Sequence, residues 1–214
     1  MSRLALAFTL LATLTSVAAA HPAVDPVQRA RMIAPPALDR DALRAKLIEN
    51  RAHNLAAFRA YQKAGVFPSN VYTQGELNVW RDEDYHFCAA ATIIRASGKI
   101  GLVDAIAEQN NFIRLVDVEQ GPVMDWILTS GFTQAELVLI QRPFRPVTEP
   151  TVTTIDPKLR TAETARLARL YKRIDATLVR NRKRSIELAL DRLMKHPAAA
   201  RALLASPSSA IVDA

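Results

Sequence analysis

The chain has 214 residues, of which 50% are hydrophobic and 23% charged, and this composition excludes a disordered tail and a low-complexity fibre. It has 6 glycines and 6% aromatic residues, too few for a β-sandwich or barrel built on glycine-rich turns and aromatic strands. The net charge of +7 favours an anionic partner over a cationic one. We therefore expect an all-α fold, an irregular helical bundle with a long C-terminal basic amphipathic helix.

The first 20 residues have the pattern of a cleaved secretory signal peptide. Arg3 supplies a positive charge, an apolar run begins at Leu4, and Ala18 and Ala20 place small side chains before the expected cleavage site. We expect an exported protein, periplasmic or extracellular, with no transmembrane span after signal cleavage. Export also makes intracellular nucleic acid an unexpected partner.

Residues 21–38 are expected to form an extended or disordered arm, because four prolines interrupt them. A central helical domain is expected over residues 39–142. Its first helix begins at Asp39 or Asp41, since leucines then recur at helical spacing, and it ends at Gly65.

The stretch after residue 84 is the richest in hydrophobic residues and predicts three helices separated by glycines. Three consecutive alanines at Ala89–Ala91 favour a helix, and a β-hairpin over residues 87–106 is the alternative. Thr133 and Glu136 have the spacing of a capping box, which predicts a helix that begins after Thr133.

A Pro/Thr linker is expected over residues 143–157, followed by one long amphipathic helix over residues 158–196 and a short helical or frayed tail over residues 197–214. Asp156 is the expected cap, and Pro157 the expected first helical residue. An apolar stripe at helical spacing indicates the amphipathic helix; it comprises Leu159, Leu167, Leu170, Ile174, Leu178, Ile186, Leu190 and Leu193.

The positive charge of the chain is concentrated in this helix. The segment from Lys158 to Arg184 contains ten Lys or Arg residues and two acidic residues, so it alone carries a net charge of +8. Such a helix binds an anionic membrane surface or another polyanion, or else packs its stripe on the domain or on a second copy. The candidate binding residues are Arg166, Arg169, Arg173, Arg180, Arg182, Lys183 and Arg184.

Cys88 is the only cysteine, so it is either buried, reactive or a link between chains. A thiol nucleophile needs a nearby base, and His86 and His53 are the candidates. His86 and Cys88 share a face on a strand but not on a helix, where His53 would have to act instead. The alternative is that Cys88 is a small buried hydrophobe.

A second set of residues combines polar and aromatic groups, and it predicts either a binding cleft or ordinary helix caps and loop contacts. These residues are Trp80, Asn111, Arg114 and Trp126. The sequence contains no cofactor fingerprint, zinc-ligand spacing or phosphate-binding loop, and we predict neither a cofactor nor a metal site.

From these features we expect an exported helical binding or scaffold protein. It would engage an anionic envelope component or a protein partner through its basic C-terminal helix, and this helix would also serve any homo-oligomer. The alternative is a thiol-dependent enzyme that uses Cys88 with His86 or His53.

Overall fold

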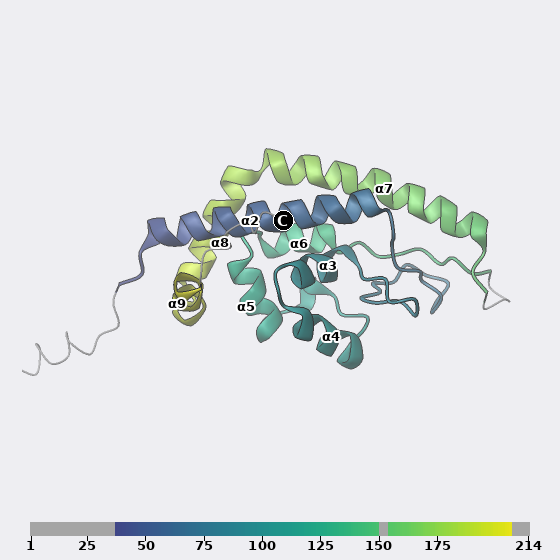
Figure 1. Ribbon diagram of the computed structural model, residues 1–214, viewed down its shortest axis with the longest axis horizontal. Coiled ribbons are helices and arrows are strands. Elements are labelled where there is room, and N and C mark those ends of the chain that lie inside the picture. Colours follow the sequence, from purple (N-terminus) through teal and green to yellow (C-terminus); the bar gives the residue numbers. More distant parts are fainter. Residues whose placement is uncertain (1–36, 150–153, 207–214) are drawn as a thin grey trace, which may run out of the picture. The chain divides into compact units, whose positions relative to one another are not determined.

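The computed structural model describes residues 37–149 and 154–206, where the predicted all-α fold is confirmed (Figure 1). These ranges contain eight α-helices, one short 3-10 helix and four isolated β-bridges, and they contain no strand. None of these helices combines the length and the apolar character that a membrane crossing requires. The predicted signal peptide, most of the predicted arm and the chain after residue 206 lie outside the described residues.

The elements are α2 (Arg40–Ala64), α3 (Ala89–Ala96), α4 (Ile100–Gln109), η1 (Leu115–Asp117), α5 (Pro122–Thr129), α6 (Gln134–Ile140), α7 (Pro157–Arg180), α8 (Arg182–Met194) and α9 (Pro197–Ala205).

Helix α2 begins and ends where the sequence predicts. The Asp39 side chain accepts the backbone N–H groups of Asp41 and Ala42, and Gly65 ends the helix with a φ of 64°. Helix α2 packs against α3, α7, α8 and α9, so it is the central element of the described bundle. Its buried face carries Leu43, Leu47, Phe58 and Tyr61.

The hairpin alternative for residues 87–106 is wrong, because this segment forms α3 and α4. Cys88 caps α3: its Sγ accepts the backbone N–H of Ala91 at 3.4 Å. The side chains of Ala89–Ala91 are buried where α3 packs against α2. Alanine both favours the helix and allows this close packing, which explains why helix wins over strand here.

Two local features join α5 to α6. Gly131 has a φ of 79°, and a Cβ at this position would lie 2.2 Å from the backbone oxygen of Leu47, so only glycine fits. The predicted capping box is confirmed. Thr133 Oγ1 accepts the N–H of Glu136 at 3.2 Å, and the Glu136 carboxylate accepts the N–H of Thr133 at 2.9 Å.

The segment expected to be a Pro/Thr linker packs against the helices in its described part. Phe144 and Val147 are buried, and Phe144 exchanges two backbone hydrogen bonds of 3.0 and 2.8 Å with Leu77. These residues belong to the same compact unit as the helices before and after them. The apolar side chains between the prolines explain this packing. Burying Phe144 and Val147 removes apolar surface from water, which stabilises the folded chain.

The segment expected to be one long helix forms two helices, α7 and α8, and α9 lies where a short helical tail was expected. Asp156 caps α7 as predicted, with its carboxylate accepting the N–H of Lys158 at 2.6 Å. A turn at Asn181 separates α7 from α8, and α9 begins at Pro197. Most of the predicted stripe is buried within the chain, so it is not free to pack on a second copy; the buried members are Leu167, Ile174, Leu178, Ile186, Leu190 and Leu193.

A buried ion pair lies beneath the turn between α7 and α8. The Arg51 guanidinium donates to both carboxylate oxygens of Glu136, at 2.9 and 2.7 Å, and also to the backbone carbonyl of Leu178 at 2.9 Å. In a continuous helix this carbonyl would accept the N–H of Arg182. Ser185 Oγ donates to Glu136 at 2.8 Å from the first turn of α8. Arg51 and Glu136 therefore fix the place where α7 ends.

Candidate functional site

The predicted thiol site is not assembled. Cys88 is 1% exposed, and burial raises the pKa of its thiol to about 12, so the thiol stays protonated near neutral pH. His86 Nδ1 lies 3.1 Å from the Asp82 carboxylate, and His53 Nε2 lies 3.0 Å from the backbone carbonyl of Ala96. Both imidazoles therefore have other partners, and the geometry supports the buried-hydrophobe interpretation of Cys88.

We expect Cys88 to resist alkylation in the native protein between about pH 5 and 9, and to react readily once the chain is unfolded in denaturant. Above its ordinary pKa of 9.0 this thiol ionises in the unfolded chain but stays protonated in the folded protein. The free energy of unfolding should therefore fall as the pH rises beyond that value. Because Cys88 is the only cysteine, the measured alkylation rate belongs to it. Fast native alkylation would contradict its burial and restore the thiol-enzyme alternative.

A group of three side chains near Cys88 has the spacing of metal ligands. One ligand atom each from Asp82, Asp84 and His86 lies within 4.8 Å of the others. However, the buried Asp82 carboxylate already accepts the backbone N–H groups of Ser69 and His86 as well as contacting the His86 ring. These contacts close the turn in which Tyr85 has a φ of 61°, and they account for the group as loop structure.

Of the four residues predicted to form a binding cleft, Trp80 and Asn111 lie together, because the Trp80 backbone N–H donates to the Asn111 backbone carbonyl at 2.8 Å, but Trp126 lines a cleft that the other three do not line. Trp80 is buried, and its Nε1 donates to the backbone carbonyl of Val103 at 3.0 Å. Asn111 uses its side-chain amide to hold a neighbouring loop, and Arg114 forms an exposed ion pair within its own turn.

The predicted basic residues are exposed, with one exception. Arg166 donates to the Glu163 carboxylate at 2.6 and 2.7 Å and to the backbone carbonyl of Pro143 at 3.0 Å, so its role is structural. Lys172, which the sequence reasoning did not single out, is exposed beside the others. We call the exposed set the cationic face; it comprises Arg169, Lys172, Arg173, Arg180, Arg182, Lys183 and Arg184.

The helical period explains how the cationic face is formed. Arg169, Arg173 and Arg180 are spaced by four and seven residues, which places them on one side of α7. The opposite side is buried at Leu178 and the rest of the stripe. After the turn, residues 182–184 are exposed at the start of α8. Among the described residues, no acidic side chain forms an ion pair with any member of this face.

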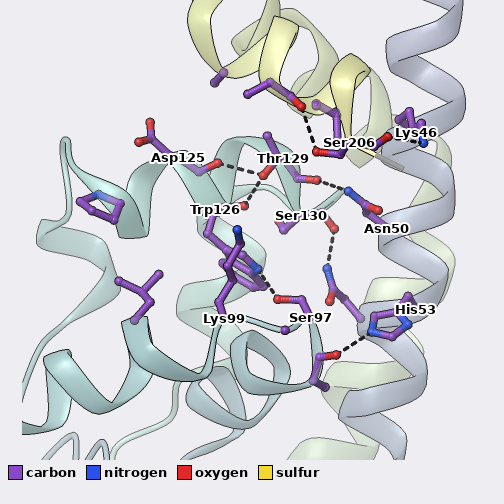
Figure 2. Close-up of a pocket in the computed structure, with 18 of the residues that line it drawn as sticks. Lys46, Asn50, His53, Ser97, Lys99, Asp125, Trp126, Thr129, Ser130 and Ser206 are labelled. Carbon is purple, nitrogen blue, oxygen red and sulfur yellow. Dashed lines mark hydrogen bonds between the residues drawn. The ribbon is translucent and has the colours of Figure 1, made fainter. Parts of the chain in front are cut away.

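A cleft of about 980 Å³ lies between α2, α5, α9 and the turn before α4 (Figure 2). Helix α2 lines it with Lys46, Asn50, His53 and Asn54. Trp126 was predicted as a cleft residue, although with other neighbours, and His53 was predicted as a base; most of the other lining residues were not predicted. The spacing of positions 46, 50 and 54 does mark one side of a helix, but the facing walls come from helices far along the chain.

Hydrogen bonds fix the polar wall of this cleft. Asn50 and Asn54 each donate from Nδ2 at 2.8 Å, to the backbone carbonyls of Thr129 and Ser130 (Figure 2). Their amide oxygens are therefore left as acceptors. Asn54 Oδ1 is buried and has no hydrogen-bond partner within the described residues. Trp126 Nε1 donates to a serine hydroxyl at 2.8 Å, which holds its ring in the cleft wall.

Comparison of the chain with protein-family models, with curated proteins and with solved structures finds no match in any of the three. The case for a function therefore rests on the geometry of the cationic face and of the cleft.

Proposed function

We propose that this chain is an exported helical binding protein that engages an anionic component of the cell envelope through the cationic face. The lack of acidic partners for this face within the described residues supports the proposal. Several arginines elsewhere are paired with acids, as Arg44 is with Glu187 and Arg59 with Asp175, whereas the cationic face gathers seven cations without such a pair in the described part of the chain. A cluster of unpaired cations keeps its field and attracts anions from solution.

The position of the cations at the start of α8 also supports binding. The N-terminal end of a helix is the positive end of its dipole, where cations are disfavoured by about 0.3–1 kcal/mol each. Residues 182–184 place three cations there, and Asn181 provides no side-chain cap to α8. The negative end of the α7 dipole lies at the same turn and offsets this cost, so what the turn presents to solvent is the charge of the side chains, which would attract an anion.

The buried stripe determines the mode of binding. Because α7 and α8 direct their apolar sides into the bundle, they cannot insert them into a lipid surface. Binding then rests on charge, which salt screens. The proposed partner is accordingly an anionic surface contacted peripherally.

The triple substitution Arg180→Gln, Arg182→Gln and Arg184→Gln tests this assignment. Each cation near an anionic lipid surface contributes about 1 kcal/mol, so we expect the triple variant to bind phosphatidylglycerol-containing vesicles ~100-fold more weakly. Vesicle co-sedimentation measures this, with phosphatidylcholine vesicles as the neutral comparison. Wild-type binding should fall steeply as salt is added.

A matched control removes three positive charges from exposed positions elsewhere, through Lys63→Gln, Arg114→Gln and Arg201→Gln. This variant should bind nearly as well as the wild type, because net charge is then equal and only position differs. Equal losses in both variants would show that net charge, and not the cationic face, drives binding. Wild-type binding to neither vesicles nor heparin would reject an anionic surface and favour a protein partner.

Export is tested by the mass of the mature chain, expected to begin at His21.

A further inference from the structure

The cleft between α2, α5 and α9 has one apolar wall and one polar wall. Helix α9 and Trp126 supply the apolar wall, together with Leu102 of α4; the α9 residues are Ala198, Ala199, Ala202 and Leu203. Lys46, Asn50 and His53 project from α2 on the other side (Figure 2). Its volume of about 980 Å³ lies at the upper end of the range of small-molecule and peptide sites.

The electrostatics of the cleft favour an anion. Helices α4, α5 and α9 all begin beside it, and none of the three has a side-chain cap at its N-terminus. The N-termini of α2, α3, α6 and α7 are each capped by a side chain, and α8 is the one other described α-helix without such a cap. Lys99 adds an exposed ammonium at the start of α4, and Asp125 is the one acidic residue among the lining residues. Asp125 lies in the first turn of α5 and offsets the dipole of that helix, which leaves the positive ends of α4 and α9 together with Lys99 beside one space.

The buried amide of Asn54 adds a second requirement. Its Nδ2 donates to Ser130, which fixes the orientation of the amide, and its Oδ1 then lacks a donor within the described residues. Asn54 is 2% exposed, and leaving such an acceptor unpaired is costly. A ligand that carries N–H groups would supply donors to this wall, whereas a fatty acid would not.

We propose that this cleft binds a short apolar peptide segment that ends in a free carboxylate. Its apolar side chains pack on Trp126 and α9, its backbone N–H groups face Asn50 and Asn54, and its carboxylate lies at Lys99 and the start of α4. One ligand of this kind would thus contact the apolar wall, the asparagine amides and the positively charged end of the cleft. The site is separate from the cationic face and does not depend on the function proposed for it.

Calorimetric titration with N-acetyl-Ala-Leu-Ala-Val tests the proposal, with the same peptide as its C-terminal amide for comparison. We expect the acid to bind at least about ten-fold more tightly than the amide, because only the acid meets the lysine and the uncapped helix end. Lys99→Gln should weaken binding of the acid roughly three-fold, because the uncapped end of α4 remains, and should leave binding of the amide nearly unchanged. Lys99 is exposed, so this variant keeps the fold.

A steric pair of variants tests the location. Ala202→Trp fills the cleft from α9 and should abolish binding, while Ala176→Trp places the same side chain at an exposed position on α7 and should not. Equal binding of acid and amide, or no heat from either peptide, would overturn the proposal. So would undiminished binding by Ala202→Trp. The triple arginine variant of the cationic face should bind the peptide as the wild type does, which separates failure of this site from failure of the vesicle test.

Discussion

Replacement of Glu136 by glutamine is expected to lower the free energy of unfolding by about 3–5 kcal/mol, because it leaves the buried charge of Arg51 without its counter-ion. The Arg51 and Glu136 side chains are 3% and 9% exposed. Glutamine has almost the same volume, so the loss reports the charge and its hydrogen bonds. Phe132, whose ring centroid lies 4.7 Å from the Arg51 guanidinium carbon, does not replace a carboxylate. Denaturant unfolding followed by circular dichroism measures the change.

Two further variants serve as controls for the Glu136→Gln measurement. Asp175→Asn breaks the more exposed pair with Arg59 and should cost less than about 1 kcal/mol. The double variant Arg51→Met and Glu136→Leu removes both charges and should recover part of the loss, because no unpaired ion remains buried, although the Leu178 carbonyl and the Ser185 hydroxyl lose these partners. A cost for Glu136→Gln as small as that for Asp175→Asn would contradict the buried network.

Gly131→Ala is expected to destabilise the protein by roughly 3 kcal/mol or more, through steric overlap added to an unfavourable backbone conformation. A Cβ at this position would lie 2.2 Å from the Leu47 backbone oxygen and 2.7 Å from both the Cβ and the backbone nitrogen of Arg51. These atoms belong to the central helix α2, which cannot move aside without disturbing its buried face. Thermal and denaturant unfolding both measure the effect.

Gly65→Ala is the matched control. Gly65 also has a positive φ, of 64°, in the left-handed helical region, but no atom lies within 4 Å of a Cβ built there. It should therefore show only the conformational cost, about 1 kcal/mol. If the two alanine variants were equally stable, the close approach of the loop to α2 would not be a constraint on the fold.

Local features of the fold could be predicted from the sequence, because each depends on residues a few positions apart. The caps at Asp39 and Asp156, the end of α2 at Gly65 and the capping box at Thr133 are of this kind. The apolar stripe of the C-terminal helices was also readable, since its spacing reflects the helical period. Ala89–Ala91 favoured helix over hairpin for residues 87–106, and the structure confirms this. The branched residues nevertheless permit both, so the sequence alone left the hairpin open as the alternative.

For the candidate sites, too, the sequence predicted some properties and the folded structure decided others. The sequence determined that the C-terminal segment concentrates the cations, but the tertiary structure decided which of them are exposed and unpaired. Arg166 forms an ion pair with Glu163, while residues 182–184 are exposed just after the turn. Cys88 and His86 lie near each other along the chain, yet burial and the Asp82 carboxylate give them separate roles.

The helical class, several helix starts and the location of the positive charge follow from the amino-acid pattern, because local hydrogen bonding and periodicity carry that information. The turn at Asn181 and the cleft arise only when distant parts of the chain pack together. Arg51 reaches Glu136 and Leu178 across 85 and 127 positions of sequence, and the walls of the cleft come from α2, α5 and α9. Such long-range contacts have no period, so no pattern along the chain predicts them.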